Sequence, residues 1–237
     1  PQVTGEFDAV VLAAGKGTRM RSELHKVLHE AAGLPLLELV LRAVRPLQPA
    51  TTVVIVGHGS AAIRRRFAGS DLVFADQAEL LGTGHARSQA APVLSGRGRP
   101  VRVLNGDGPL ITSQTIAALA RAQGRSAGMS LVTSEVSEPK GLGRIVRTRA
   151  GDVDFIVEEK DATPEQLLIT EINPGIYAFD DSVFERTQRI GNDNNSGEYY
   201  ITDLLTQYRD AGLPVRGVPA ASEDEVLAVN DKVEDGE

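Results

Sequence analysis

Short apolar runs alternate with longer amphipathic stretches through the first half of the chain. Residues 9–12 and 51–56 form continuous apolar or β-branched runs, which are typical of strands covered on both faces. Between them, apolar side chains recur at helical spacing over residues 35–47. The pattern continues with predicted helices at 60–67, 84–94 and 112–123 and predicted strands at 72–75 and 101–104.

This alternation predicts an α/β fold. Strands that are separated by helices of this length are joined by right-handed crossovers and form a mostly parallel, doubly wound sheet of the Rossmann-like kind. Ligands of such sheets bind at the carboxyl ends of the strands. The loops that contain Gly15 and Asp107 both follow predicted strands, so we expect the two loops to lie at the same edge.

The second half of the chain has a different pattern. Three strand-like segments at 129–136, 143–148 and 153–158 follow one another with few helix signals, and Gly151-Asp152 reads as a hairpin turn. They predict an antiparallel extension of the sheet. Further predicted elements are a strand at 172–179, a helix at 197–211 and an edge strand at 215–218. We expect one domain, 1–237, with halves at about 6–126 and 127–232.

Composition narrows the classes of protein. The formal net charge is −7, which argues against a broad surface for nucleic acid or anionic membrane. The chain contains no cysteine, so disulfides, thiolate zinc sites and a cysteine nucleophile are excluded. It has no apolar run long enough for a transmembrane helix and no signal peptide pattern near its start. We expect a cytoplasmic protein.

The loop after the first predicted strand combines glycines with positive charge. Gly15 and Gly17 allow successive backbone N–H groups to point into one concavity, which suits phosphate oxygens. Four cations lie within eleven residues: Lys16, Arg19, Arg21 and Lys26. The alternative is an ordinary turn with solvated charges. Because the chain as a whole is acidic, this local basic cluster favours a polyanion site.

Asp107 follows the predicted strand at 101–104 and lies between two glycines, so we expect its carboxylate to stand free at the ligand edge of the sheet. Mg²⁺ prefers such oxygen ligands and usually takes one or two from the protein. The alternative is that the carboxylate caps a turn or the following helix. Asn230 offers a second oxygen ligand, or simply ends a helix.

Two further groups of residues carry recognition chemistry. Gln77 has a paired donor and acceptor for a pyrimidine edge, with backbone at Gly82 and Thr83 to complete the contact. Because the amide can flip, uracil and cytosine both remain open, and an exposed Gln with a helix cap is the alternative reading. Glu158 and Asn173 can hold hexose hydroxyls, although Glu158 also fits a solvated charged edge.

The stretch LAAGKGTRM closely resembles the opening motif of the sugar-1-phosphate nucleotidyltransferases, and GDGPL resembles the motif that accompanies it in uridyltransferases. Seven motifs in one order, from Ala9 to Lys232, are similar to the pyrophosphorylase domain of the bacterial bifunctional N-acetylglucosamine-1-phosphate uridyltransferases/glucosamine-1-phosphate acetyltransferases. The resemblance implies a nucleotide-diphospho-sugar transferase fold. It also implies an enzyme that makes UDP-N-acetylglucosamine, a peptidoglycan precursor, and pyrophosphate from UTP and N-acetylglucosamine 1-phosphate with Mg²⁺.

The resemblance also implies roles for individual residues. The implied catalytic residues are Arg19, Lys26 and Asp107, and the implied Mg²⁺ ligands are Asp107 and Asn230. The implied nucleotide contacts are Leu12, Ala13, Ala14, Gly15, Gly17, Gln77, Gly82, Thr83, Asn105 and Gly106. The implied sugar contacts are Gly143, Glu158 and Asn173.

The chain departs from the family pattern mainly on the sugar side. Asn105 and Leu142 stand where the family usually has tyrosines, and Pro174 stands where Thr or Ala is usual. Alternatives are therefore another sugar 1-phosphate such as glucose 1-phosphate, a non-sugar alcohol phosphate or molybdopterin-like acceptor, or a non-catalytic nucleotide-sugar sensor. The family's β-helical acetyltransferase half is not represented, so we expect a monomer for this piece and a trimer if such a domain follows.

Overall fold

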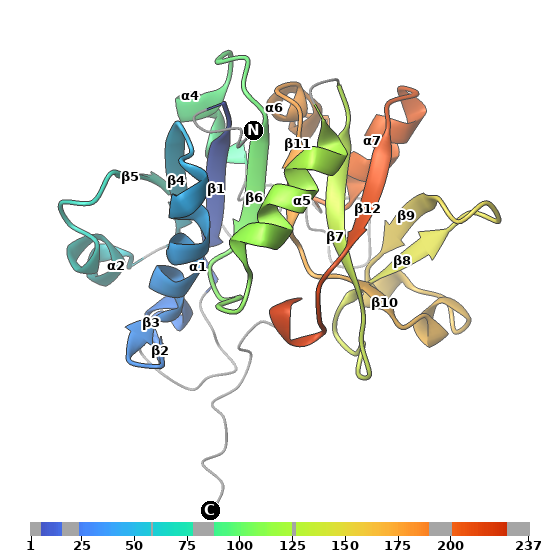
Figure 1. The fold of residues 1–237 in the computed structure, drawn as a ribbon, viewed down its shortest axis with the longest axis horizontal. Coiled ribbons are helices and arrows are strands. Elements are labelled where there is room, and N and C mark those ends of the chain that lie inside the picture. Colours follow the sequence, from blue (N-terminus) through green and yellow to red (C-terminus); the bar gives the residue numbers. More distant parts are fainter. Residues whose placement is uncertain are drawn as a thin grey trace, which may run out of the picture.

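Ten strands of the described residues form one mixed sheet with helices on both faces (Figure 1). The computed structural model describes residues 6–15, 24–57, 59–77, 88–124, 127–189 and 201–226. The sheet strands are β1 (Asp8–Ala13), β4 (Thr51–Val56), β5 (Leu72–Asp76), β6 (Val101–Asn105), β7 (Met129–Glu135), β8 (Gly143–Arg147), β9 (Val153–Val157), β10 (Glu171–Asn173), β11 (Tyr177–Phe179) and β12 (Val215–Pro219). Their order is β5-β4-β1-β6-β11-β7-β10-β8-β9, and β12 pairs with β7.

Helices and short turns complete the described part of the chain. The α-helices are α1 (Leu36–Val44), α2 (Ala61–Arg66), α4 (Ala91–Leu94), α5 (Ser113–Gln123), α6 (Val183–Thr187) and α7 (Asp203–Asp210). The 3₁₀ turns are η2 (Lys26–Leu28), η3 (Arg45–Leu47), η4 (Glu159–Asp161), η5 (Gln166–Leu168) and η6 (Asp224–Val226), and β2 (Glu30–Ala31) pairs with β3 (Leu34–Pro35) in a small hairpin. None of the described helices has the length and apolar character to cross a membrane.

The first half is a parallel sheet centred on β1. β1 pairs in parallel with β4 on one side and with β6 on the other, and β5 extends the sheet beyond β4. The central residues of β1 and β4 are fully buried, as their continuous apolar sequences predict. The register places Leu12 opposite both Ile55 and Asn105, so the three strands end at one edge. The predicted α/β class is confirmed.

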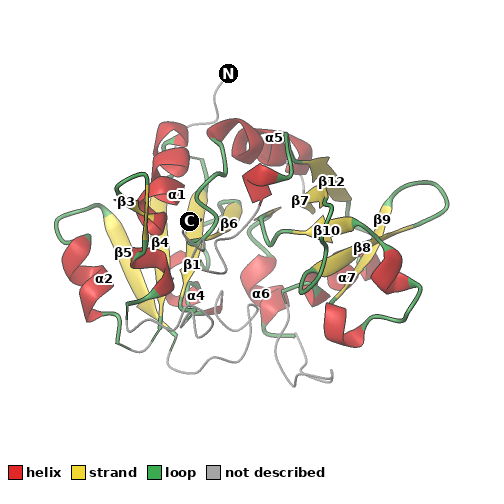
Figure 2. Ribbon diagram, turned by 90° about the horizontal axis from the view of Figure 1, so that it is seen from below, coloured by secondary structure: helices red, strands yellow, loops and turns green. Residues whose placement is uncertain are grey.

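Two apolar cores lie on the two faces of the sheet. Figure 2 shows α1 and α5 over one face and α4, α6 and α7 over the other. On the first face, Leu37 and Val40 of α1 and Leu119 of α5 belong to the same buried cluster as Val11 of β1. On the second face, Leu204 of α7 belongs to the cluster that contains residues of β6, β7, β8 and β9. Both cores run past the boundary between the parallel and antiparallel strands, which makes the sheet one packed layer.

Helix α5 begins where the sequence predicted. Thr112 is its N-cap, and the Thr112 hydroxyl accepts a hydrogen bond from the Thr115 N–H at 3.2 Å. Gly124, with φ of +74°, ends the helix in a backbone conformation that L side chains rarely adopt. The cap matters for the site because Thr112 follows the Asp107 loop directly and fixes where that loop ends.

The antiparallel extension is confirmed. β8 pairs antiparallel with both β9 and β10, and β10 pairs antiparallel with β7. Gly151 turns the β8–β9 hairpin with φ of +91°, as expected for Gly151-Asp152. β12 pairs in parallel with β7 alone among the described strands, so it is the predicted edge strand.

The single strand predicted at 172–179 is wrong. The segment forms two strands, β10 and β11, separated by Pro174, Gly175 and Ile176. Proline has no N–H to donate, and Gly175 has φ of +83°, so the ladder cannot continue through them. Both strands pair with β7, but on their other side β10 pairs with β8 whereas β11 pairs with β6. This break is therefore where the two halves of the sheet meet.

Two predicted helices are described only in part. In the segment predicted as a helix at 84–94, residue 88 and α4 are helical with a turn at residues 89–90 between them, and residues 84–87 lie outside the described part. The helix predicted at 197–211 is α7, which begins at Asp203; residues 197–200 also lie outside the described part.

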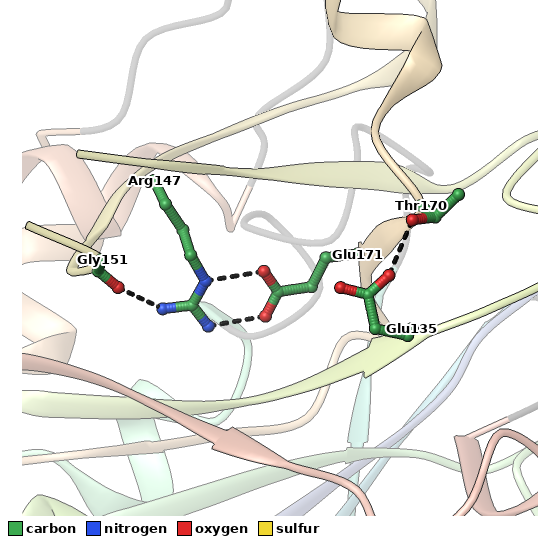
Figure 3. Close-up of polar contacts among 5 residues, drawn as sticks. All are labelled: Glu135, Arg147, Gly151, Thr170 and Glu171. Atoms are coloured by element: carbon green, nitrogen blue, oxygen red, sulfur yellow. Dashed lines mark hydrogen bonds and ion pairs between the residues drawn. The ribbon is translucent and has the colours of Figure 1, made fainter. Parts of the chain in front are cut away.

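A polar cluster fastens the far end of the antiparallel extension (Figure 3). Arg147 donates through Nε and Nη2 to the two carboxylate oxygens of Glu171 at 2.7 and 2.6 Å, and through Nη1 to the Gly151 carbonyl at 2.7 Å. The Thr170 hydroxyl donates to Glu135 at 2.7 Å. The two-pronged pairing holds β8 and its hairpin to β10. Burial alone would raise the pKa of Glu171, but hydrogen bonds from Arg147 and Thr133 lower it below its ordinary value.

Glu171→Gln should lower the free energy of unfolding by about 1 kcal/mol at pH 7, because the variant loses a two-pronged, charge-assisted pair whose side chains are 35% (Arg147) and 15% (Glu171) exposed. Since the pKa of Glu171 is lowered in the folded protein, the carboxylate stabilises the fold above its unfolded pKa, and this stabilisation is lost as pH falls through the folded pKa. Urea unfolding at pH 7 and at pH 3 measures both effects.

The matched control is Glu185→Gln, because Glu185 of α6 pairs with Arg189, just beyond the end of the helix, and both side chains are exposed. It should change the free energy of unfolding by less than about 0.5 kcal/mol. If both variants lost the same free energy of unfolding, the Arg147–Glu171 pair would stabilise the fold no more than an exposed surface pair does, which would contradict this prediction.

Candidate functional site

The carboxyl ends of the parallel strands bring most of the described nucleotide-site candidates to one edge. Leu12, Ala13, Ala14 and Gly15 end β1, and Asn105, Gly106 and Asp107 end β6 beside them. The Gly106 N–H donates to the Leu12 carbonyl at 2.8 Å, which joins the two strand ends directly. Figure 1 shows these strands side by side in the same direction. These candidates therefore lie at the carboxyl edge of the strands, where ligands of parallel sheets bind.

Glycine is required for the close approach of these strand ends. A Cβ at Gly57, which follows β4, would lie 2.7 Å from the Ala14 carbonyl oxygen. A Cβ at Gly106 would lie 3.0 Å from the Leu12 carbonyl oxygen. The backbones consequently pack without side chains between them, and the glycine-bearing loop after β1 begins from a fixed position.

Lys26 and Asp107 form the central charged contact. The Lys26 ammonium lies 2.5 Å from an Asp107 carboxylate oxygen, although the residues are 81 positions apart in the sequence. The side chains are 13% and 22% exposed, so both charges remain accessible at the edge. Buried Val27 anchors the Lys26 turn against the Gly106 backbone. The prediction that the Asp107 carboxylate stands free is corrected, because it is paired.

Gln77 lies at the neighbouring strand end. Its backbone N–H donates to the Val56 carbonyl at 2.8 Å, which aligns the end of β5 with the end of β4. The residue is only 3% exposed. The alternative of an exposed surface glutamine is therefore wrong.

A buried acid that the sequence reading missed closes the Asp107 loop. The Glu225 carboxylate accepts from the Thr112 N–H at 3.0 Å, the Thr112 hydroxyl at 2.6 Å and the Ala221 N–H at 3.0 Å. Burial alone would raise the pKa of Glu225, but these hydrogen bonds lower it below its ordinary value. A pocket lined by Asn105, Gly108, Pro174 and Val226, among others, lies next to this contact.

The three sugar-site candidates come together on the antiparallel strands. Asn173 of β10 pairs directly with Gly143 of β8, so the two residues face the same side. The Glu158 carboxylate oxygens lie 3.4 and 3.5 Å from the position that a Cβ on Gly143 would occupy. Asn173 is 8% exposed and Glu158 is half-buried. Glu158 is therefore not a fully solvated edge charge.

Arg144 and Glu159 support this group and were also missed. Arg144 is 2% exposed; its Nη1 donates to the Leu142 carbonyl, and its Nη2 donates to Glu159 at 3.1 Å. The Gly141 N–H donates to the same Glu159 oxygen at 2.5 Å, and this hydrogen bond, with that from Arg144, lowers the pKa of Glu159. The contacts hold the loop before Gly143 against the turn after Glu158.

The two groups are linked through Asn105. Its side-chain Nδ2 donates to the Pro174 carbonyl at 2.9 Å. Asn105 lies two residues before Asp107, and Pro174 follows Asn173 directly. The nucleotide-side and sugar-side candidates therefore meet across one hydrogen bond. Five predicted site residues lie outside the described part of the chain: Arg19, Gly17, Gly82, Thr83 and Asn230.

Parallel strands whose glycine-bearing carboxyl ends lie beside a paired lysine and aspartate are typical of α/β nucleotide-binding domains. Residues 9–198 match the MobA-like NTP transferase domain family. Because the match covers most of the chain, the chain belongs to this family.

Relatives and solved structures agree with this assignment. The chain is 44% identical over 233 residues to "Bifunctional protein GlmU" of Geobacter metallireducens, covering 97% of this chain and 49% of that protein. It is 46% identical to the protein of the same name from Paraburkholderia phytofirmans, covering 95% and 50%. The chain thus spans about half the length of these curated relatives. The family resemblance drawn from the motifs is confirmed.

Two solved structures share the fold. An inositol-1-phosphate CTP transferase from T. maritima superposes with a TM-score of 0.70 at 15% identity, covering 95% of this chain and 94% of that one. A UDP-glucose pyrophosphorylase in complex with UDP-glucose gives a TM-score of 0.72 at 18% identity, covering 86% and 87%. These likenesses confirm the Rossmann-like nucleotidyltransferase fold.

Gly57→Ala should destabilise the protein by about 1–3 kcal/mol, because the new methyl group would displace the Ala14 carbonyl at the start of the glycine-bearing loop. Thermal unfolding measures the loss. Gly108→Ala is the control, since a Cβ there meets only the Asn105 carbonyl oxygen at 4.0 Å. Its melting temperature should stay close to that of the parent chain; equal losses would contradict the packing account.

Proposed function

We propose that this domain transfers a uridylyl group from UTP to N-acetylglucosamine 1-phosphate, forming UDP-N-acetylglucosamine and pyrophosphate. The observation that carries the proposal is the Lys26–Asp107 pair at the ligand edge, two residues from the Asn105 link to the Gly143, Glu158 and Asn173 group. One group has charges suited to phosphates, and the other has hydroxyl-binding chemistry. A nucleotide joined to a sugar through a diphosphate needs both.

The reaction is an in-line displacement at phosphorus. An oxygen of the sugar 1-phosphate forms a bond to the α-phosphorus of UTP, and the bond from that phosphorus to the bridging oxygen of the pyrophosphate breaks. The attacking oxygen is already anionic, so the reaction needs no general base. The protein therefore contributes position and charge neutralisation.

The phosphate roles follow from the chemistry of the residues. The amides of the Gly15–Gly17 loop and Arg19 suit the triphosphate, and Lys26 suits the α-phosphate or the entering phosphate. Lys26 is held beside Asp107 with both charges partly exposed. An approaching anion can therefore share the ammonium without a large cost in desolvation.

The residues also fit a Mg²⁺ ion. Asp107 gives one carboxylate at the phosphate edge, and Asn230 would give a second oxygen. Mg²⁺ usually takes only one or two protein ligands and completes its coordination with water and substrate phosphates. When bound, Mg²⁺ would neutralise phosphate charge and help to orient the two phosphates.

Base and sugar recognition complete the proposal. Buried Gln77 has the paired donor and acceptor that a uracil edge requires, and Gly82 and Thr83 would add backbone contacts. Glu158 can accept from two sugar hydroxyls, while Asn173 and the Gly143 N–H supply further polar contacts. We also propose that residues 1–237 act as one cytoplasmic domain and, as this piece, as a monomer.

Pyrophosphate release tests the function directly. The domain should release pyrophosphate from UTP and N-acetylglucosamine 1-phosphate with Mg²⁺, and should be at least tenfold less efficient in kcat/KM with CTP or with glucose 1-phosphate. A preference for glucose 1-phosphate would move the assignment to another sugar. Binding of UDP-sugars without any turnover would support a sensing module instead.

Asp107→Ala should lower kcat by at least about 100-fold, because the variant loses a metal ligand and the partner of Lys26 together. Steady-state pyrophosphate release at saturating UTP and Mg²⁺ measures the change. Asp71→Ala is the matched control, since exposed Asp71 precedes β5 at the opposite edge of the sheet, and it should retain parent activity. Near-normal turnover by Asp107→Ala would contradict the assignment.

A further inference from the structure

We infer that Tyr177 is a positioning residue that fixes the orientation of the Asn173 amide, and so tunes affinity for the sugar half of the substrate. The inference rests on the proposed function, because it assumes that Asn173 contacts the sugar. Tyr177 is 1% exposed, and it therefore acts through Asn173 from within the core.

Asn173 lies at a boundary within the sheet. It is the last residue of β10, directly before the break that separates β10 from β11. Beyond the break, β11 is held on both sides by β6 and β7, whereas β10 is held by β7 and β8. Asn173 consequently sits where the two halves of the sheet diverge, and strand pairing alone does not fix its side chain.

A hydrogen bond from Asn105 fixes the backbone at the break. The Asn105 amide donates to the Pro174 carbonyl at 2.9 Å. A Cβ at Gly175 would lie 2.6 Å from the same Asn105 nitrogen, so only glycine leaves room for this contact. Gly175 also has φ of +83°, which other residues rarely adopt. The backbone that follows Asn173 is therefore clamped to the nucleotide side.

Two hydrogen bonds fix the orientation of the Asn173 amide. The Gly175 N–H can only donate, and it lies 3.2 Å from Asn173 Oδ1, so this oxygen must face Gly175. The amide nitrogen, Nδ2, then faces the Tyr177 hydroxyl oxygen at 2.6 Å and donates to it. One N–H and one oxygen lone pair of Asn173 are not used by these two contacts. A sugar would contact this remaining N–H and this lone pair, and the fixed amide orientation decides which side offers the donor and which the acceptor.

The Tyr177 hydroxyl is itself held in place by the packing of its ring. The Tyr177 ring stacks on Phe179 with centroids 5.5 Å apart, and Phe179 stacks on Tyr208 at 6.0 Å. All three rings belong to the core on the α7 face. Because packed neighbours hold the ring in place, movement of the ring cannot supply another acceptor. Removal of the hydroxyl therefore leaves the Asn173 nitrogen without this acceptor.

Tyr177→Phe should therefore raise KM for N-acetylglucosamine 1-phosphate about five- to tenfold and change KM for UTP less than about twofold. The ring and its packing remain, so the chain should fold. In equilibrium binding by calorimetry, Kd for UDP-N-acetylglucosamine should rise by a similar factor while Kd for UDP stays unchanged. The second measurement needs no turnover.

Tyr208→Phe is the matched control. Tyr208 is equally buried, lies in the same stack of rings, and donates its hydroxyl to Asp180 at 2.8 Å, away from the sugar-site candidates. This variant should lower the melting temperature and leave both KM values within twofold. An equal rise of KM for the sugar phosphate in Tyr208→Phe would mean that loss of core packing explains the effect, and would overturn the inference.

A double-mutant cycle with Asn173→Ala separates positioning from a general structural role. If Tyr177 acts through Asn173, Tyr177→Phe should change KM for the sugar phosphate less than twofold in the Asn173→Ala background. A full five- to tenfold effect in that background, or no effect in the parent chain, overturns the inference. If the parent chain neither turns over sugar phosphates nor binds UDP-sugars, the proposed function itself fails.

Discussion

One ion pair sets the geometry on which the proposed site depends. The Lys26 ammonium and the Asp107 carboxylate meet at 2.5 Å from two loops that are 81 residues apart in the sequence. They meet because β1 and β6 pair in parallel and end together, with the Gly106 N–H bonded to the Leu12 carbonyl. An unpaired cation at this edge would repel the metal, and an unpaired anion would repel the phosphates. The pair keeps the Lys26 cation available for the phosphates and the Asp107 anion available for the metal.

The broken strand gives the sheet a second specialised region. β10 and β11 lie along the same side of β7, but the Pro174–Gly175 break lets β11 join the parallel half while β10 joins the antiparallel half. The Asn105 side chain closes the gap at Pro174. The proposed phosphate and sugar sites are thus connected by rigid, buried backbone, which is how a protein holds two substrates in line.

Much of this arrangement was predictable from the sequence, and the exceptions have physical causes. Apolar runs such as residues 51–56 predicted the parallel strands because burial on both faces leaves a direct signal. The break at Pro174 was missed because the apolar residues around it suggested one strand, although proline beside glycine is itself a signal of interruption. The roles of Glu225, Arg144 and Tyr177 could not be predicted, since each depends on register and side-chain direction between distant segments.

A crystal structure of the domain with UDP-N-acetylglucosamine and Mg²⁺ would show whether Lys26 and Asp107 hold the phosphates and the metal. We expect the diphosphate within hydrogen-bond distance of Lys26, the metal about 2.1 Å from an Asp107 oxygen, and sugar hydroxyls on Glu158 and Asn173. A ligand bound at another edge of the sheet, with Lys26 and Asp107 still paired to each other and touching neither phosphate nor metal, would disprove the proposed site.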